Sequence, residues 1–484
     1  MTERRPSIAI VGAGFGGLAA AIELKRAGHD DIVILERGDD VGGVWRDNTY
    51  PGAACDVPSP FYCYSFAPNP AWPRRFSQQP AILDYIRNVV DGHDLRRHLR
   101  LSTEVVSAAY DEGTHRWTLG LSDADPVVVD VVVFAVGQLS HPVVPPIPGR
   151  DSFAGPQFHT ASWDHSVDLR DKRVAIVGTG ASAVQVVPAI AADVARLTVF
   201  QRSAPYLLPR PDCEFGDRRQ RVFRSVPASQ LLERVTWYSL VETLSVAWVH
   251  APALSSLIRS VSHEHMRRGS REQPGLFEKV WPDYPIGCKR ILFSSDYLPA
   301  LARPNVDLVT DRIERIVPSG IVTDDGVEHP ADIVVWGTGF AAADFLATIP
   351  VTGLGGVALA DRWAAGARAY FGLTVPDFPN LLIMYGPNTN TGGGSIIYFL
   401  ETQARYVRDF MDRLTQVRGA MSVRTEVADE FDERIQTLLS GSVWTQCSSW
   451  YRDASGRVTT NWPLLGIDYR RQARFFPDDY EVIA

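Results

Sequence analysis

The pattern of apolar and polar residues predicts two strand–helix–strand units. Residues 7–37, SIAIVGAGFGGLAAAIELKRAGHDDIVILER, run from a short apolar strand through a glycine turn into an alanine-rich amphipathic helix and a second apolar strand. Residues 172–203, KRVAIVGTGASAVQVVPAIAADVARLTVFQRS, repeat that order. Strands that alternate with helices are typical of parallel sheets. The chain is therefore expected to be an α/β protein.

The first unit carries the glycine spacing of a dinucleotide-binding turn. Gly12 would permit the tight turn, Gly14 would let the backbone approach a pyrophosphate, and Gly17 would let the helix pack on the strand. The pyrophosphate would lie at the helix N-terminus. Glu36 ends the second strand, where its carboxylate can accept a hydrogen bond from a ribose 2′-hydroxyl.

The second unit repeats the spacing with Gly178, Gly180 and Ala183, an alanine being permitted at the third position. Ser182 and Gln185 lie in the first turns of this predicted helix and are assigned to the same cofactor site. The chain is thus expected to hold two dinucleotides on two Rossmann-like domains.

The end of the second unit favours NADPH over NADH. Its last strand leads into Gln201 and Arg202 rather than into an acidic residue. A guanidinium suits a 2′-phosphate, which a carboxylate would repel. The alternative is that Arg202 is an ordinary solvated loop cation.

The segments between the units suggest how the domains are arranged. The stretch HPVVPPIPG after residue 140 must be extended, because successive prolines exclude a helix. An apolar strand returns within residues 329–340. We expect a first domain in two parts, residues 1–140 and 333–484, around a hinge and second domain at 141–332, with a helical insertion at 206–286.

Composition and charge exclude several classes of protein. The 484 residues are 45% apolar and 21% charged, which is typical of a globular chain of two or three domains. The net charge of -8 and the dispersed Lys and Arg leave no basic stripe for nucleic acid. No uninterrupted apolar run reaches the length of about 18 residues that a transmembrane helix needs. The N-terminus lacks the pattern of a signal peptide, so a cytoplasmic location is expected.

The five cysteines form no C-x-x-C pair. Their spacing argues against a dithiol relay and a thiolate zinc site, and a reducing compartment fits best. His263 and His265 are the best metal candidates, but an i,i+2 spacing puts them on different faces of a helix. No metal site is therefore expected.

The stretch FAGPQFHTASWD, residues 153–164, follows the proline-rich hinge. It places Phe153, Gly155, His159, Trp163 and Asp164 in the pattern F-x-G-x-x-x-H-x-x-x-W-[PD]. A lone histidine such as His159 is more often structural than chemical. With the two glycine turns on either side, however, the chain resembles a type I Baeyer–Villiger monooxygenase, a class B flavoprotein monooxygenase.

The resemblance implies FAD and NADPH as cofactors and O2 as co-substrate. The implied reaction inserts one oxygen atom next to a ketone carbonyl, giving an ester or lactone through a C4a-peroxyflavin. His159 would be linked to the relative motion of the two domains. Aromatic residues in the insertion and near residue 398 suggest an apolar ketone, although such residues are more often core. No pattern indicates the oligomeric state.

The resemblance also assigns residues near the flavin and the nucleotide. GGVWRDNTYPGAACD is similar to the family's flavin-side loop and places Gly43, Trp45, Tyr50 and Asp56 there. YPIGCKR is similar to the segment with the catalytic arginine, preceded by a lysine near the nicotinamide nucleotide. CSSW resembles a C-terminal loop whose tryptophan closes over NADP. These three residues are Arg290, Lys289 and Trp450.

The chemistry of the implied reaction suits these assignments. Arginine stays protonated and offers a planar fork of donors to a negative peroxide and then to a developing oxyanion. Asp56 would orient Arg290 by a charge-assisted pair, or would instead cap a turn. Two other functions stay open: a flavin monooxygenase that oxygenates nitrogen or sulfur, and a flavin reductase or silent flavoprotein.

Overall fold

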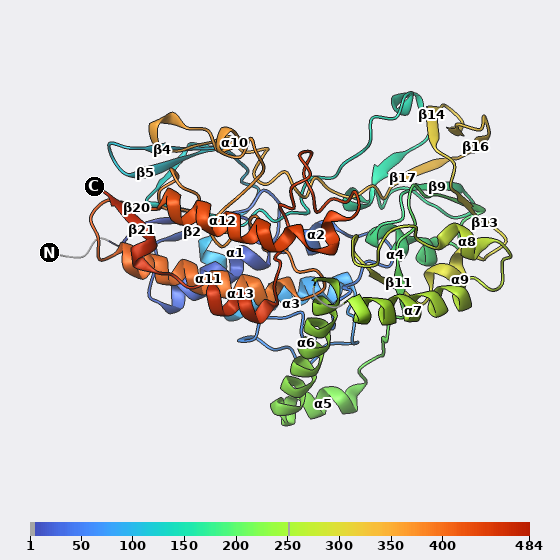
Figure 1. Cartoon of the computed structure of the whole chain (residues 1–484), viewed down its shortest axis with the longest axis horizontal. Helices are drawn as coiled ribbons and strands as arrows, with labels where there is room; N and C mark the ends of the chain where they lie inside the picture. Colours follow the sequence, from blue (N-terminus) through green and yellow to red (C-terminus); the bar gives the residue numbers. More distant parts are fainter. Residues whose placement is uncertain (1–4, 250–251) are drawn as a thin grey trace.

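The computed structural model describes residues 5–249 and 252–484. It has two lobes side by side along the longest axis, each built on a five-stranded parallel sheet (Figure 1). The first described residues, from Arg5, and the C-terminus both lie in the lobe that carries the first sheet (Figure 1).

The first sheet has the order β19-β7-β1-β2-β3. Its central strands are apolar along their whole length, as expected for parallel strands covered on both faces. Helix α1 (Phe15–Arg26) packs on one face together with α11 (Ile396–Leu414), which arrives from the far end of the chain. The strands are β1 (Ile8–Val11), β2 (Ile32–Leu35), β3 (Leu99–Arg100), β7 (Val131–Phe134) and β19 (Leu381–Ile383).

The other face of this sheet is covered by a smaller sheet of order β18-β4-β5-β6. Trp117 is fully buried between the two sheets, and its Nε1 donates to the backbone oxygen of Pro379 at 2.8 Å. The strands are β4 (Val105–Asp111), β5 (Arg116–Leu121), β6 (Val127–Val129) and β18 (Val351–Thr352).

The second sheet has the order β13-β10-β9-β17-β8. Helices α4 (Ala181–Ile190) and α9 (Tyr297–Leu301) pack against each other beside it. The strands are β8 (Gln157–His159), β9 (Arg173–Val177), β10 (Arg196–Phe200), β13 (Val306–Val309) and β17 (Ile333–Trp336).

Strand β17 corrects the expected return point of the chain. The boundary at residue 333 would assign β17 to the first domain, yet it pairs with β9 and β8 in the second sheet. An apolar strand is suited to either sheet, and only the pairing decides between them. The chain therefore returns to the first lobe after Trp336.

Two crossover segments connect the lobes and are hydrogen-bonded to each other. The amide of Val143 donates to the oxygen of Gly339 at 2.9 Å, and the amide of Ala341 donates to the oxygen of His141 at 3.0 Å. The outgoing and returning chains thus form a paired connection rather than two independent linkers.

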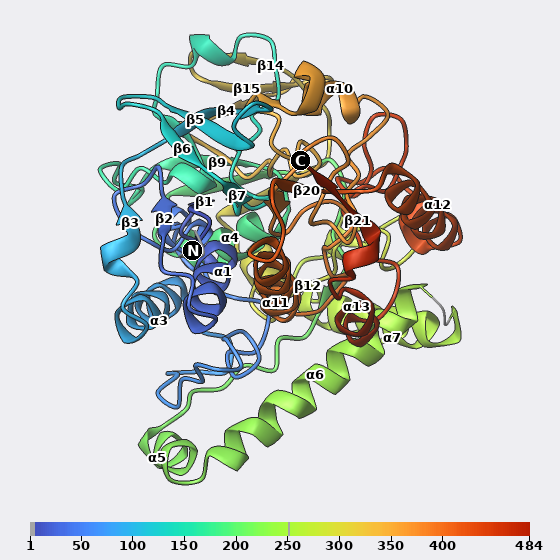
Figure 2. The ribbon, with the colours of Figure 1, turned by 90° about the vertical axis from the view of Figure 1, so that its left-hand side faces the viewer.

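The described part of the expected insertion, residues 206–249 and 252–286, holds four helices, of which α5 and α6 extend away from the two lobes (Figures 1 and 2). Helix α6 is fastened to the first lobe, because Arg234 donates from Nη1 to the oxygens of Cys63 and Pro60 at 2.8 and 3.2 Å. No helix within residues 5–249 and 252–484 is long and apolar enough to cross a membrane. The helices are α5 (Asp217–Ser225), α6 (Pro227–Val249), α7 (Pro252–Gly269) and α8 (Leu276–Val280).

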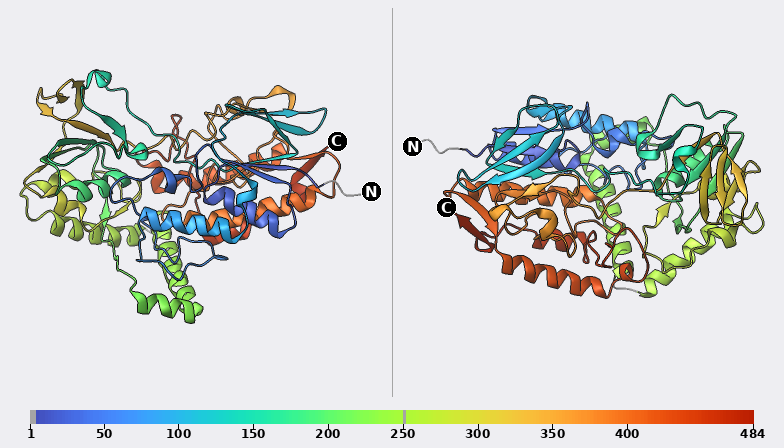
Figure 3. Two further views of the ribbon diagram at one scale, coloured as in Figure 1. Left: turned by 180° about the vertical axis from the view of Figure 1, so that it is seen from behind. Right: turned by 90° about the horizontal axis from the view of Figure 1, so that it is seen from above.

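The remaining elements complete the two lobes (Figure 3). The C-terminal part of the chain runs along the first lobe, where α12 and α13 follow α11. These elements are α2 (Val44–Asp47), α3 (Gln79–Gly92), α10 (Leu359–Arg362), α12 (Thr425–Ser440), α13 (Gly466–Gln472), β11 (Leu207–Leu208), β12 (Leu292–Phe293), β14 (Ile313–Val317), β15 (Gly320–Thr323), β16 (Glu328–Pro330), β20 (Ala420–Val423) and β21 (Tyr480–Ile483).

The second glycine turn provides a test of the fold. Gly178 has φ +112°, and a Cβ there would stand 2.3 Å from the oxygen of Gly337. Gly178→Ala should lower the free energy of unfolding by about 1–3 kcal/mol, the usual cost of placing a residue with a side chain at a positive φ. Gly180→Ala is the matched control, because Gly180 has φ -75° and open space around it. Thermal melting of both variants checks this; equal midpoints would contradict the argument.

Candidate active site

The two glycine turns have the same geometry in both lobes. Gly12 has φ +108°, and a Cβ there would stand 2.5 Å from the oxygen of Ala135, much as in the turn at Gly178. Gly14 and Gly180 precede α1 and α4, and neither helix has a side-chain cap. The first backbone N–H groups of both helices can therefore donate to an anionic ligand such as a pyrophosphate.

The first turn fits the diphosphate and ribose of a dinucleotide. Glu36 accepts from the amide of Ala13 at 2.8 Å, which holds its carboxylate beside the turn. Arg46 also pairs with this carboxylate at 2.7 Å. A Cβ at Gly43, which has φ +53°, would lie 3.3 Å from the Cα of Gly14, so two glycines leave room where the loops approach.

The second turn ends beside a cluster of cationic side chains. Arg202 is exposed, and Nζ of Lys289 donates to Oγ of Ser203 at 3.0 Å. Burial and the charge of Arg202 lower the pKa of Lys289. The two like charges repel each other, and an anion bound between them would relieve that repulsion. Gln201, in contrast, is buried and donates to the oxygen of Lys279 at 2.7 Å.

Three of the residues assigned to cofactors from the sequence meet at the contact between the lobes. The hydroxyl of Tyr50 donates to Oε1 of Gln185 at 2.9 Å, and Ser182 also interacts with this hydroxyl. Nε2 of Gln185 donates to the oxygen of Ala54 at 2.9 Å. Burial raises the pKa of Tyr50 to about 12, so the phenol stays neutral. These side chains hold the flavin-side loop on helix α4.

Arg290 and Asp56 form an ion pair across the two lobes. Nη2 and Nε of Arg290 donate to Oδ2 of Asp56 at 2.5 and 3.2 Å, although the residues are 234 positions apart. The Asp56 carboxylate raises the pKa of the Arg290 guanidinium, which therefore stays cationic. The side chain of Arg290 is 39% exposed, so it keeps donors that can face a ligand.

Two tyrosines missed by the sequence analysis lie within electrostatic range of Arg290. Burial raises the pKa of Tyr451 to about 12 and also raises the pKa of Tyr385, while the charge of Arg290 opposes both shifts. Both phenols thus stay neutral, and the hydroxyl of Tyr385 donates to Oδ1 of Asn390 at 2.9 Å. No spacing in the sequence links either tyrosine to Arg290, because they come from the returning part of the chain.

The residues of the pattern at 153–164 lie between the crossover and the second lobe, where β8 pairs with β17. His159 ends β8, is buried, and lies edge-on to the ring of Phe340 in the returning crossover at 5.6 Å. Burial lowers its pKa. A Cβ at Gly155 would stand 2.2 Å from the oxygen of Asp332, and Trp163 packs on Phe158 at 5.0 Å. The pattern therefore forms the wall beside the paired crossover segments.

Residues 9–214 match the family model described as pyridine nucleotide-disulphide oxidoreductase. The chain is 43% identical to a Baeyer–Villiger monooxygenase of Streptomyces coelicolor, over 96% of this chain and 90% of that protein. It is 40% identical to one of Pseudomonas aeruginosa, over 98% and 90% of the two chains.

The chain belongs to the Baeyer–Villiger monooxygenase family. A solved structure of cyclohexanone monooxygenase from Rhodococcus sp. Phi1 bound to NADP+ matches it with a TM-score of 0.86 and 28% identity, over 97% of this chain and 96% of that one. The predicted family, the α/β fold with two Rossmann-like units and the class of FAD- and NADPH-dependent monooxygenase are thereby confirmed. Oxygen insertion next to a ketone is favoured over oxygenation of nitrogen or sulfur.

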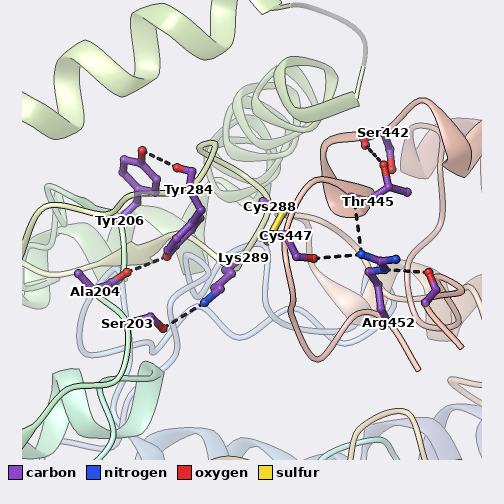
Figure 4. Close-up of a disulfide and its surroundings, with 11 residues drawn as sticks. Ser203, Ala204, Tyr206, Tyr284, Cys288, Lys289, Ser442, Thr445, Cys447 and Arg452 are labelled. Atoms are coloured by element: carbon purple, nitrogen blue, oxygen red, sulfur yellow. Dashed lines mark hydrogen bonds between the residues drawn. A yellow bond between two sulfur atoms is a disulfide. The ribbon is translucent and has the colours of Figure 1, made fainter. Parts of the chain in front are cut away.

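A disulfide between Cys288 and Cys447 corrects the expectation of reduced thiols in this Baeyer–Villiger monooxygenase (Figure 4). The cysteines are 159 positions apart, and no C-x-x-C spacing could indicate the pair. The sequence did hold one indication of the pair. Cys288 lies in YPIGCKR and Cys447 lies in CSSW, and both segments were assigned to the same nucleotide. Trp450 is half-buried in the second of these segments and packs on Tyr451 at 4.4 Å.

A narrow hollow is lined by residues from three separate parts of the chain. The insertion contributes Glu242, the loop near residue 392 contributes glycines, and the C-terminal part contributes aromatic side chains. Trp444 of this lining is in ring contact with Tyr451 at 6.2 Å, and Tyr451 is in turn near Arg290. Gly392 and Gly394 line the hollow, where bulkier residues would reduce its volume.

The contact between the lobes can be tested at Gln185. Gln185→Ala removes the hydrogen bonds to Tyr50 and Ala54 and leaves partly buried polar groups without these partners, which costs about 1–3 kcal/mol. Thermal melting should show a midpoint lower by a few degrees. Tyr50→Phe, which removes only the hydroxyl, should have a smaller effect. An unchanged midpoint for Gln185→Ala would show that this contact does not stabilise the protein.

Proposed function

We propose that Arg290 is the catalytic cation of the Baeyer–Villiger reaction in this chain and that Asp56 positions it. The family reaction uses NADPH and O2 to insert one oxygen atom next to a ketone carbonyl. Negative charge builds up on oxygen during that reaction, first on the attacking oxygen and then on the former carbonyl. The ion pair of Arg290 with Asp56 at 2.5 Å is the observation that carries the assignment.

The residues of the first lobe would hold FAD. The first amides of helix α1, which follow Gly14, would bind the pyrophosphate, Glu36 would bind the ribose, and the loop of Gly43 and Trp45 would lie by the flavin. Bound FAD, once reduced by NADPH, supplies the activated oxygen. Trp45 donates from Nε1 to the hydroxyl of Tyr62 at 3.0 Å, which keeps its ring in place.

Arg290 can serve the two halves of the reaction because its partner holds only one end of the guanidinium. Asp56 accepts from Nη2 and Nε through a single oxygen, so the remaining donors stay available. The guanidinium can then donate to the developing oxyanion while the carboxylate fixes its orientation. Tyr385 and Tyr451 add neutral phenols near the guanidinium, of which Tyr385 donates to Oδ1 of Asn390 at 2.9 Å.

The second lobe would hold NADPH, with Gly178 and Gly180 at the pyrophosphate and Arg202 and Lys289 at the 2′-phosphate. Ser203 supports this assignment, because it accepts from Lys289 and keeps the ammonium beside Arg202. Trp450 would close over the nucleotide. His159, beside the paired crossover segments, would adjust with the relative motion of the lobes.

We assign FAD to residues 1–140 with the returning part of the chain, and NADPH to the lobe between them. The substrate would be an apolar ketone, bound in the hollow that Phe61, Tyr398 and Trp444 line. Aromatic side chains offer apolar surface there, and displacement of water from such a pocket favours binding of an apolar molecule.

The role of Arg290 predicts a separation of flavin reduction from oxygen insertion. Arg290→Ala should still bind FAD and be reduced by NADPH, but its rate of ester formation should fall by about 100- to 1000-fold, as when an oxyanion donor is lost. Arg290→Lys keeps the charge but lacks the planar fork of donors. Its rate of ester formation should lie between the rates of the wild type and of Arg290→Ala. Loss of the oxidised flavin absorbance on anaerobic addition of NADPH measures reduction, and the yield of ester measures oxygen insertion. Esters at the wild-type rate in Arg290→Ala would overturn the role.

The 2′-phosphate site predicts a change in cofactor preference. Arg202→Ala should raise the Michaelis constant for NADPH by about 10- to 100-fold, the loss of one charge-assisted contact, and leave the constant for NADH nearly unchanged. Arg170→Ala is the control, because Arg170 is an exposed arginine of the same lobe that pairs with Asp168. Initial rates with both nucleotides decide; equal changes for NADPH and NADH would contradict the assignment.

A further inference from the structure

The Cys288–Cys447 disulfide joins two segments that both carry residues of the site (Figure 4). On one side, Lys289 and Arg290 directly follow Cys288. On the other, Trp450 and Tyr451 come within four positions of Cys447. A single covalent bond therefore sets the distance between the cationic segment and the aromatic C-terminal loop.

The C-terminal loop has its own internal support. Arg452 donates from Nη1 to the oxygens of Thr445 and Cys447 at 3.3 and 3.4 Å, and from Nε to the oxygen of Gly456 at 2.7 Å (Figure 4). These bonds lie within the loop and do not reach the segment of Arg290. If the disulfide were opened, the loop would keep its shape but lose its covalent connection to that segment.

Noncovalent contacts also join the two segments. Val443 packs against the small cluster that contains Ile286 and Ile291, and Tyr451 lies within electrostatic range of Arg290. The disulfide adds a covalent constraint, because it fixes the separation of the two backbones at 6.1 Å between the Cα atoms.

We propose that Cys288 and Cys447 are a redox-sensitive cross-link that holds the Trp450 loop over the nucleotide. The inference rests on the proposed function, in which Lys289 and Trp450 bind NADP. In the oxidised protein the loop is tethered in its closed position and NADP+ is retained. In the reduced protein the loop opens, and NADP+ dissociates more readily.

The reduction step is ordinary thiol–disulfide exchange. A thiolate of an external dithiol attacks Sγ of Cys447, because Cys447 is half-buried whereas Cys288 is fully buried. The S–S bond breaks, Cys288 leaves as a thiolate and takes a proton, and the second thiol of the dithiol resolves the mixed disulfide. The dithiol loses the two electrons that the pair gains.

Hydrogen peroxide is the oxidant that closes the pair again. A flavin monooxygenase releases it when oxygen activation is not coupled to ketone oxidation. The two thiols give up two electrons and two protons, and one peroxide molecule becomes two molecules of water. Uncoupled turnover would thus restore the tether that keeps the nucleotide in place.

The test compares the FAD-loaded protein before and after reduction with dithiothreitol. Intact mass after thiol alkylation gives the state of the pair, and equilibrium titration gives the dissociation constant for NADP+. If the untethered loop is closed for about a tenth of the time, the constant should rise by about tenfold on reduction and return after treatment with hydrogen peroxide.

Variants separate the tether from a general effect of thiols. Cys447→Ser should bind NADP+ like the reduced wild type and should not respond to dithiothreitol. Cys213→Ser, which changes a half-exposed cysteine outside the pair, should behave like the wild type in both states. If Cys447→Ser does not fold, reduction of the wild type alone still decides the question.

Two results would overturn the inference, and they differ in meaning. Equal dissociation constants for the oxidised and reduced wild type, with the opened pair seen by mass, would show that the cross-link does not control the loop. An oxidised protein that fails to bind NADP+ would overturn the nucleotide assignments and this inference with them. A protein in which peroxide never closes the pair would overturn the inference and leave the proposed function untouched.

Discussion

The ion pair between Arg290 and Asp56 is the interaction on which the site depends. A guanidinium that keeps its charge at a partly buried position needs a partner, since desolvation of an unpaired cation is costly. Asp56 supplies that partner from the other lobe. The same contact therefore stabilises the charge and determines how the lobe with the cationic residues faces the lobe with the flavin-side loop.

The other contacts between the lobes serve the same arrangement. Tyr50 and Gln185 hold the flavin-side loop on α4, and the crossover segments are hydrogen-bonded between Val143 and Gly339. In both glycine turns the backbone lies close to a carbonyl oxygen at the neighbouring strand end. At the crossovers, His159 and Phe340 are in contact.

The C-terminal part of the chain completes the site from outside the two βαβ units. It brings Tyr385 and Tyr451 near Arg290 and lines the hollow with Trp444. The disulfide at Cys447 makes this part continuous with the segment of Arg290. Residues that are far apart in the chain thus act within one small volume.

Local rules were enough to predict the two nucleotide-binding turns, because a tight turn between a strand and a helix depends on neighbouring residues and on glycine at positions such as Gly12 and Gly178. The pattern at 153–164 indicated the family by its resemblance to a known motif rather than by a conformational rule. Long-range partners were beyond such rules. The sheet of β17, the bond of Cys288 to Cys447 and the contact of Tyr50 with Gln185 each join segments whose own sequences suit several partners. The sequence by itself thus determined the fold class and the two glycine turns, and its resemblance to the family proposed Arg290. Only the tertiary structure decided which distant side chains meet around Arg290, since packing selects among pairings that are equally acceptable locally.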